Sequence, residues 1–273
     1  MKNLDTGTEH LIAKIENNVG YLIMNRPEAR NAMSSEMNGA LQEKIAEFEL
    51  DEEVRCVVLT GAGNAFCAGG DVKGMNAKNE GDSEKDTIDK AIHRQRDNQR
   101  GTSGKLYKMP KPTIASLPGA AAGAGLSYAL SCDLRIMSSA AFMTTAFAKV
   151  GFSGDYGGTY FMSQLIGSAK ARELYFLSDR VSAEEALNLG LTNWVVESDN
   201  LEAKTKEIAE QLATGPSVAY RYMKENLNRA MNGDVDECLD LEATHHVHCG
   251  QTTDHKNAVK AFVEKQQPKF SGK

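Results

Sequence analysis

The stretch TIASLPGAAAGAGLSYALSCDLRIM, residues 113–137, decides the fold class. Residues 113–117 are apolar and β-prone, and they end at a Pro-Gly pair that is typical of a turn. The small residues that follow predict a helix starting near Ala122, and residues 134–137 predict a second strand. A strand, a glycine-rich loop, a helix and another strand in this order indicate an α/β domain.

The segments before this stretch fit the same class. Two β-rich runs, residues 11–16 and 21–24, flank an Asn-Asn turn and predict a hairpin. Ser34 or Ser35 is a suitable cap for a helix with apolar residues every three to four positions. Residues 54–60 predict a buried strand. Strands and helices therefore alternate over the first half of the chain.

The segments after it are mostly helical. The motif SAEE at residues 182–185 fits a capping box, in which a serine and a glutamate satisfy the first amides of a helix. Further helices are predicted over residues 201–212, 218–231 and 235–265. We therefore predict a core over residues 1–195 and a helical region over residues 196–273.

Residues 75–105 differ from both parts because they are polar, charged and poor in β-branched residues. We predict a loop with some helix that helps to shape a pocket. The loop is longer than an ordinary connection, which favours a function for it.

Composition excludes several classes of protein. The 273 residues carry a net charge of −6, which favours neither nucleic acid nor an anionic membrane as a partner. The five cysteines contain no CxxC pair, so reduced thiols in a cytosolic protein are the simplest interpretation. We find no signal-peptide pattern, and Pro118 interrupts the least polar stretch. We expect a cytoplasmic protein that spans no membrane.

Two glycine-rich loops each follow a predicted strand, GAGNAFCAGGD at residues 61–71 and PGAAAGAGLS at residues 118–127. Either loop alone fits turn glycines and tight helix packing. Facing one another, the loops would form an oxyanion hole, because small residues and a helix N-terminus expose amide donors. A dinucleotide fingerprint is rejected because Tyr128 stands at its third glycine position.

Three further polar groups are candidates for chemistry. GFSGD at residues 151–155 resembles a nucleophile elbow but lacks the last glycine, which leaves Ser153 as an alternative nucleophile. Asp155 is either a turn cap or an acid/base. His245 and His248 share one helix face, which fits a polar face or interface unless further ligands complete a metal site. We predict no metal.

The chain resembles the crotonase, or enoyl-CoA hydratase/isomerase, superfamily over nearly its whole length. The motifs that carry the resemblance are MNRPEARNA (24–32), AFCAGGDV (65–72), SLPGAAAGAG (116–125), CD (132–133), GGT (157–159) and AFVEK (261–265). The resemblance implies a crotonase-like spiral of ββα units with a C-terminal helical trimerisation region. It also implies a homotrimer or dimer of trimers acting on an acyl-CoA thioester, with coenzyme A as part of the substrate and no other cofactor.

The resemblance also implies a site. The thioester oxygen would lie between the backbone amides of Gly70 and Ala124. Residues expected to bind the acyl-CoA are Arg30, Ala68, Gly69, Asp71, Val72, Gly123, Phe147, Phe152, Tyr156, Phe262 and Lys265. Of these, Phe262 and Lys265 would approach the nucleotide end from a neighbouring subunit.

One departure from the family pattern sharpens the expectation. Family hydratases carry two glutamates that hold and activate water, and these positions are Ser127 and Phe147 here. Several family isomerases and aromatic-CoA dehalogenases instead place an aspartate at the position of Asp155. We therefore predict enoyl-CoA double-bond isomerisation with Asp155 as acid/base, in a cleft whose Phe147, Phe152 and Tyr156 raise the pKa of that carboxyl group.

Alternatives stay open at this point. Within the enzyme class they are a hydratase with a different base, an acyl-CoA hydrolase and a dehalogenase with Asp155 as nucleophile. A non-catalytic acyl-CoA binder would also fit the loss of both glutamates. RNA binding lacks a basic patch in this sequence.

Overall fold

A computed structural model describes residues 1–71 and 87–273 of the chain. In this part of the chain the larger sheet has seven strands, in the spatial order β1 (Lys2–Leu4), β2 (Leu11–Glu16), β3 (Val19–Met24), β4 (Cys56–Gly61), β6 (Thr113–Leu117), β8 (Leu134–Ser138) and β11 (Trp194–Val196). The first two pairings are antiparallel and the rest are parallel. The predicted hairpin is confirmed, with Glu16 opposite Val19.

A smaller sheet lies beside it and is built from short strands that follow the long ones. Its spatial order is β10 (Val181–Ser182), β9 (Phe142–Thr144), β7 (Ala120–Ala122) and β5 (Ala65–Cys67). β5 follows β4, and β7 follows β6, after a tight turn in each case. β5 and β7 lie inside the two glycine-rich loops and pair in parallel, so the loop residues that follow each strand emerge at the same sheet edge.

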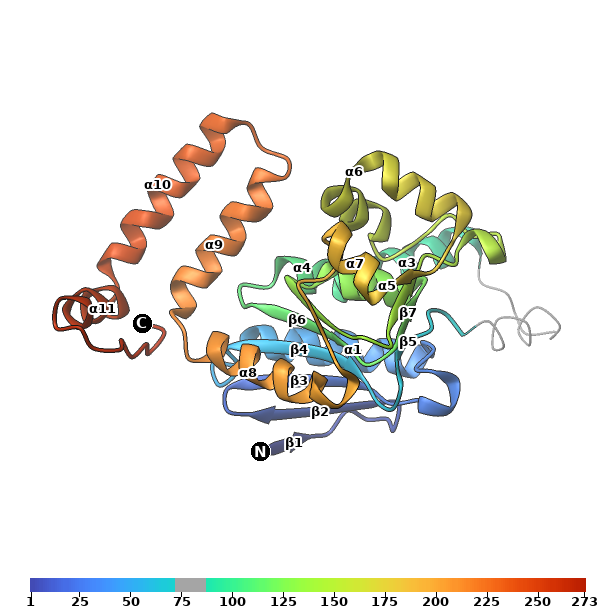
Figure 1. Ribbon diagram of the computed structural model, residues 1–273, viewed down its shortest axis with the longest axis horizontal. Helices are drawn as coiled ribbons and strands as arrows, with labels where there is room; N and C mark the ends of the chain where they lie inside the picture. Colours follow the sequence, from blue (N-terminus) through green and yellow to red (C-terminus); the bar gives the residue numbers. More distant parts are fainter. Residues whose placement is uncertain (72–86) are drawn as a thin grey trace.

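Helices cover both faces of the larger sheet (Figure 1). Alternate residues of β4 point to opposite sides, so Val57 and Leu59 belong to one apolar cluster, and Cys56 and Val58 to the other. The first cluster includes α1 (Ser35–Leu50) and α5 (Ala124–Ser131), and the second includes α8 (Leu201–Ala213). The cap predicted for α1 is confirmed, because the Ser34 hydroxyl accepts a hydrogen bond from the Met37 amide at 3.1 Å.

The remaining helices form two groups. α3 (Ile88–Gly101), α4 (Ser103–Lys108), α6 (Gly158–Leu177) and α7 (Ala183–Leu189) surround the smaller sheet. α9 (Ser217–Ala230), α10 (Val235–Gln251) and α11 (Thr253–Val263) project from the core, and we call them the arm (Figure 1). The predicted division at residue 195 falls inside β11, and α8 packs on the core sheet.

The structure corrects one expected element, refines a second and adds a third. The predicted helix over residues 235–265 is two helices, because Thr252 turns the chain and its hydroxyl caps α11. The helix expected within the loop of residues 75–105 is present, since α3 begins at Ile88 with Thr87 as its cap, while residues 75–86 lie outside the described residues. Sequence patterns also missed α6, which changes direction at Gly167 (φ 77°).

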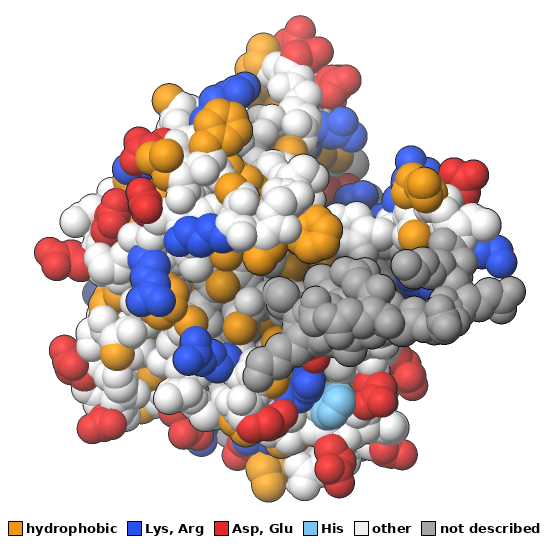
Figure 2. Space-filling view, turned by 90° about the vertical axis from the view of Figure 1, so that its right-hand side faces the viewer, with side chains coloured by type: hydrophobic (Ala, Val, Ile, Leu, Met, Phe, Trp, Pro, Cys, Tyr) orange, Lys and Arg blue, Asp and Glu red, His pale blue; other side chains and the backbone are white. Residues whose placement is uncertain are grey.

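Helix length and surface charge also bear on the class of protein. No helix of the described residues is long and apolar enough to cross a membrane. Figure 2 shows acidic and basic side chains interspersed over the face that it displays. The mixed charges of this face give no support to binding of a nucleic-acid backbone there.

Candidate active site

Asp155 lies in a tight turn that leads into α6. The Gly158 amide donates to the Asp155 carbonyl oxygen at 3.1 Å and closes the turn. Gly154 (φ 111°) and Gly157 (φ 77°) adopt left-handed conformations that side chains rarely take, which explains the glycines on both sides of the aspartate. The turn therefore holds the Asp155 side chain at a defined place on the core.

The Asp155 side chain is half-buried, and one of its carboxyl oxygens is fully buried without a hydrogen-bond partner. Its Oδ1 atom has no hydrogen-bond partner among the described residues. Burial raises the pKa of this carboxyl group to about 6. An aspartate that caps a turn would accept a backbone N–H, so the turn-cap alternative gains no support here. A carboxylate poised near neutral pH is suited to take and return a proton.

The first glycine-rich loop is tied to the segment that precedes α1. The Met33 amide donates to the Gly69 carbonyl at 2.8 Å, and the Ala68 amide donates to the Arg30 carbonyl at 3.0 Å. Gly69 needs its glycine, because it has a φ of 91° and a Cβ atom there would meet the Ala122 carbonyl at 2.8 Å. The two glycine-rich loops therefore touch.

The amides predicted to form the oxyanion hole lie on these touching loops. A Cβ atom placed on Gly69 would be 3.6 Å from the Ala124 amide nitrogen. Ala124 is the first residue of α5, so its N–H lacks an intrahelical acceptor. We find no hydrogen bond from the Gly70 or Ala124 amide among the described residues. Two unpaired donors on neighbouring loops are the arrangement that a developing oxyanion requires.

Gly70 and Asp155 border a single cavity of about 480 Å³. Asp71 and Tyr156 also line this cavity, so it contains four of the predicted site residues. Sequence patterns missed its other walls, to which α1 and α3 contribute. These walls include Ser34, Ser35, Asn38, Arg94, Gln95 and Asn98. Only the polar composition of residues 75–105 pointed towards the α3 wall.

Tyr156 follows Asp155 in the chain and also lines the cavity. Its ring meets the Tyr128 ring edge-on at 4.9 Å, and the Asn38 Nδ2 atom donates to its hydroxyl at 3.4 Å. Its backbone amide donates to the Gln99 Oε1 atom at 2.6 Å, which ties α3 to the turn. Burial raises the pKa of the Tyr156 phenol to about 12, so this group stays neutral at physiological pH.

Phe147 and Phe152, both predicted to line the cleft, lie in different environments. Phe147 is buried, and its ring stacks on that of Tyr175 at 6.0 Å and 9°. The Phe152 side chain is 58% exposed, and it is not among the described residues that line the cavity with Asp155. Left-handed Gly151 and Gly154 flank this residue and turn its segment outward.

The other residues predicted to bind coenzyme A are more dispersed. Arg30 is exposed in a left-handed conformation, and Asp71 pairs with Arg26 at 3.1 Å. Val72 lies outside the described residues. Phe262 (84% exposed) and Lys265 lie at the end of the arm and do not border the cavity with Asp155.

Gly123 and Ser127 lie at the start of α5. Gly123 has a φ of 54°, and its amide donates to the Thr144 carbonyl at 3.1 Å. Ser127 is buried, and its hydroxyl donates to the Gly123 carbonyl at 3.4 Å. Ser127 and Phe147 therefore bring no carboxylate to this part of the core.

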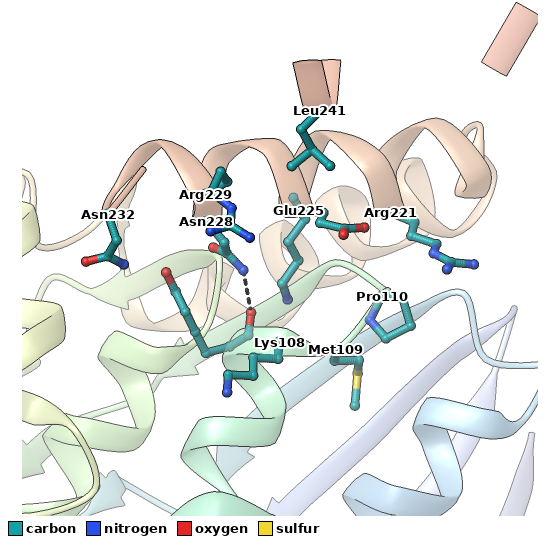
Figure 3. Close-up of a pocket in the computed structure, with 11 residues that line it drawn as sticks. Lys108, Met109, Pro110, Arg221, Glu225, Asn228, Arg229, Asn232 and Leu241 are labelled. Atoms are coloured by element: carbon teal, nitrogen blue, oxygen red, sulfur yellow. Dashed lines mark hydrogen bonds between the residues drawn. The ribbon is translucent and has the colours of Figure 1, made fainter. Parts of the chain in front are cut away.

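A second cavity, of about 540 Å³, lies between the core and the arm (Figure 3). It is bordered by Met109 and Pro110 of the core, by α9 and by Leu241 of α10. The Asn228 side chain crosses it to the Tyr107 carbonyl at 3.0 Å. It contains no residue that sequence patterns predicted for the site.

The two histidines singled out in the sequence join α9 to α10. The His245 ring stacks on Tyr222 at 4.1 Å, and its Nδ1 atom lies 2.5 Å from Asn226 Oδ1. His248 meets the same tyrosine edge-on. In the part of the chain that the structure describes, no three His, Cys, Asp or Glu side chains form a group suited to a metal.

Comparison with known proteins places the chain in a family. Residues 14–273 match the family model described as enoyl-CoA hydratase/isomerase. The chain is 34% identical to the 1,2-epoxyphenylacetyl-CoA isomerase of Escherichia coli, covering 97% of this chain and 99% of that one. It is 36% identical to the short-chain-enoyl-CoA hydratase of Clostridium acetobutylicum, covering 94% and 96%. A crystal structure of enoyl-CoA hydratase from Bacillus anthracis superposes with a TM-score of 0.88, at 28% identity and 97% and 100% coverage.

Proposed function

The chain belongs to the enoyl-CoA hydratase/isomerase family, and we propose that it isomerises the double bond of an enoyl-CoA with Asp155 as acid and base. The observation that carries the proposal is the buried, unpartnered Oδ1 atom of Asp155 in the cavity that also contains Gly70. A buried polar atom without a partner costs free energy, so a ligand group is the natural occupant of the space that it faces.

The proposed reaction is a 1,3-proton shift. The Asp155 carboxylate removes a proton from the carbon next to the thioester of a 3-enoyl-CoA, and the electron pair moves onto the thioester oxygen. The Gly70 and Ala124 amides donate to that oxygen and hold the enolate. Protonated Asp155 returns the proton to the γ-carbon, which leaves the conjugated 2-enoyl-CoA. Atoms and electrons balance without another reactant.

Isomerisation fits the side chains better than hydration does. Hydration needs a water molecule held and activated opposite the double bond, and Ser127 and Phe147 supply no carboxylate for this purpose. Water addition is the second candidate, because the chain is 36% identical to the short-chain-enoyl-CoA hydratase named above. Water addition by this chain would need a base other than the two missing glutamates, and the paired assay separates the two reactions by their products.

We propose that the coenzyme A portion lies along the first glycine-rich loop. Arg30, Ala68 and Gly69 would border the pantetheine side, because Ala68 and Gly69 lead directly to the Gly70 amide. Gly123 would border the pantetheine beside the Ala124 amide. Phe262 and Lys265 would contact the nucleotide bound to a neighbouring subunit, since their exposure in one chain leaves them available.

We also propose that the arm assembles copies of the chain into a trimer or dimer of trimers. Large apolar side chains on the arm are 57% to 84% exposed, namely Leu227, Val235, Leu239, Val247 and Phe262. Exposed apolar surface of this extent favours burial against another protein surface. Light scattering should give a mass three or six times the 29.7 kDa of one chain, and a monomeric mass would contradict assembly.

A paired assay tests the proposed reaction. One sample receives a trans-3-enoyl-CoA and the other a trans-2-enoyl-CoA, and the absorbance of the conjugated thioester is followed in both. We expect the signal to rise in the first sample and to stay constant in the second. A fall in the second sample would establish hydration instead, and binding without any change would favour a non-catalytic acyl-CoA binder.

A panel of saturated and halogenated aromatic acyl-CoAs covers the remaining alternatives. Release of free coenzyme A would indicate a hydrolase, and release of halide would indicate a dehalogenase with Asp155 as nucleophile. We expect neither. The Asp155→Asn variant accompanies every assay, with Asp199→Asn as the control because Asp199 is exposed.

A further inference from the structure

Tyr175 packs against both sides of the turn that carries Asp155. A Cβ atom placed on Gly158 would lie 2.5 Å from the Tyr175 hydroxyl oxygen and 2.3 Å from Ser127 Oγ. A Cβ atom placed on Gly154 would lie 3.1 Å from Tyr175 Cε1. The ring therefore covers the glycine that precedes Asp155 and the glycine that closes its turn, with no room for a methyl group at Gly158.

The Phe147 ring packs against the Tyr175 ring. Phe147 stacks on it at 6.0 Å and 9°, and Phe147 itself is buried. The two aromatic rings form a continuous wall beside the Asp155 turn. Burial and the nearby Asp155 charge both raise the pKa of the Tyr175 phenol, which therefore stays neutral and adds no charge.

The Tyr175 hydroxyl forms no hydrogen bond with Asp155 or with any other described residue. The contribution of Tyr175 to the turn is therefore made by its ring. We propose that this ring keeps water from one side of the Asp155 carboxylate, the side away from the cavity, and fixes its turn, which makes Tyr175 a positioning residue for the base. The catalytic consequence rests on the proposed function, whereas the exclusion of water does not.

The consequence for Asp155 follows from solvation. A carboxylate next to water ionises near its ordinary pKa of about 4, and a dry one resists ionisation. The pKa of Asp155 is raised to about 6, and burial is the cause. Other titrating or charged groups on the cavity are His10, Glu36, Asp71 and Arg94. These groups are the same in all variants below. A difference in the Asp155 pKa between variants therefore measures the effect of the Tyr175 ring.

The test is a ¹³C NMR titration of protein labelled at aspartate carboxyls, with the Asp155 signal assigned by its absence in Asp155→Asn. Tyr175→Val shortens the wall, and we expect the Asp155 pKa to fall from about 6 by at least about one unit towards 4. Tyr175→Phe keeps the ring and should leave the pKa unchanged. Phe176→Val is the matched control, because the neighbouring Phe176 is 71% exposed.

A second variant guards against loss of the fold. Tyr175→Leu keeps apolar volume near Gly154 but is too short to reach Gly158, so we expect a smaller fall in the same direction. An unchanged Asp155 pKa in both Tyr175→Val and Tyr175→Leu would overturn the proposal. The kcat/KM profile with an enoyl-CoA should follow the NMR titration. If the wild type turns over no enoyl-CoA, the proposed function fails while the titration still decides the role of Tyr175.

Discussion

The cleft and the arm leave opposite kinds of group unsatisfied. Around the cleft the apolar side chains are mostly buried, while Asp155 Oδ1 and the Gly70 and Ala124 amides lack hydrogen-bond partners among the described residues. In the arm the buried polar groups are paired, while side chains such as Val247 (62%) and Phe262 (84%) are exposed. Unpaired polar groups in a cavity favour binding of a small polar ligand, because the ligand can form the missing hydrogen bonds. Exposed apolar side chains favour contact with another protein surface, because contact buries them.

The attachment of the arm shows how completely its polar groups are paired. Lys224 of α9 is buried, and its ammonium group donates to Asp133 Oδ2 at 2.8 Å and to two backbone carbonyls of the core. Asp133 also accepts from the Thr113 amide at 2.8 Å. At the other end, Asp254 accepts from the Ser271 and Gly272 amides, and this lowers the pKa of its carboxyl group. None of these groups remains available for catalysis.

The largest effect should come from the cleft. Asp155→Asn removes the proposed acid/base, and we expect turnover of a 3-enoyl-CoA to fall roughly 10²- to 10⁴-fold. Affinity for the product should change little, because the amide has the shape of the carboxylate. Steady-state kinetics and calorimetry measure the two quantities. Equal turnover by Asp155→Asn and wild type would remove Asp155 from the mechanism.

The same variant should gain stability. The folded-state pKa of Asp155 is raised to about 6, so protonation stabilises the fold below about pH 4. This contribution is lost as the pH rises through 6, where the ionised carboxylate becomes a cost. An asparagine side chain carries no charge, so Asp155→Asn should raise the free energy of unfolding at pH 8 by about 1–2 kcal/mol. A decrease at pH 8 would contradict the unpaired state of this carboxyl group.

The next largest effect should come from the attachment of the arm. Lys224→Ala leaves the partly exposed Asp133 carboxylate without its cation and should lower the free energy of unfolding by about 2–3 kcal/mol. Limited proteolysis should then cut first between α8 and α9. Lys204→Ala is the control, because Lys204 pairs with exposed Glu207 and should change stability by under about 0.5 kcal/mol. Equal losses in the two variants would mean that the buried pair does not hold the arm.

A substitution at the contact of the two glycine-rich loops should lower the free energy of unfolding less than Lys224→Ala does. A Cβ atom at Gly125 would meet the Cys67 carbonyl at 2.4 Å, so Gly125→Ala must push α5 away from β5. We expect a loss of about 1–3 kcal/mol in stability and a lower kcat, because Ala124 moves with the helix. Gly39→Ala, with nothing within 4 Å of its Cβ position, should stabilise α1 by up to about 1 kcal/mol.

The pH dependence sharpens the description of the cleft. As a base, Asp155 must be ionised, and its pKa is about 6. The kcat/KM should therefore be constant at neutral pH and fall about tenfold per unit below pH 6. This acid limb should be absent in the residual activity of Asp155→Asn. If kcat/KM fell only below about pH 4, water would reach the Asp155 carboxylate in solution.

Sequence patterns predicted the cleft better than its walls. The glycine-rich loops were found because turns and close backbone approaches demand small residues, and the family resemblance then assigned Gly70, Ala124 and Asp155 to a site. The structure brings Gly70 and Asp155 to one cavity and places the second loop in contact with the first. Tyr175 and Gln99 were missed, because their importance depends on contacts with residues far away in sequence. Phe152, predicted from its place in the sequence near Asp155, is 58% exposed and does not border the cavity with Asp155.

The smallest effect on the single chain should come from the exposed side of the arm. Val247 is 62% exposed on α10, so Val247→Ser should change the unfolding of an isolated chain by under about 0.5 kcal/mol. If the arm joins copies of the chain, the same change places a hydroxyl in an apolar interface and weakens association. Light scattering over a dilution series separates the two quantities. Unchanged mass at every concentration would show that this face of α10 stays exposed, and the exposed apolar side chains of α9 and α11 would then be the remaining route to assembly.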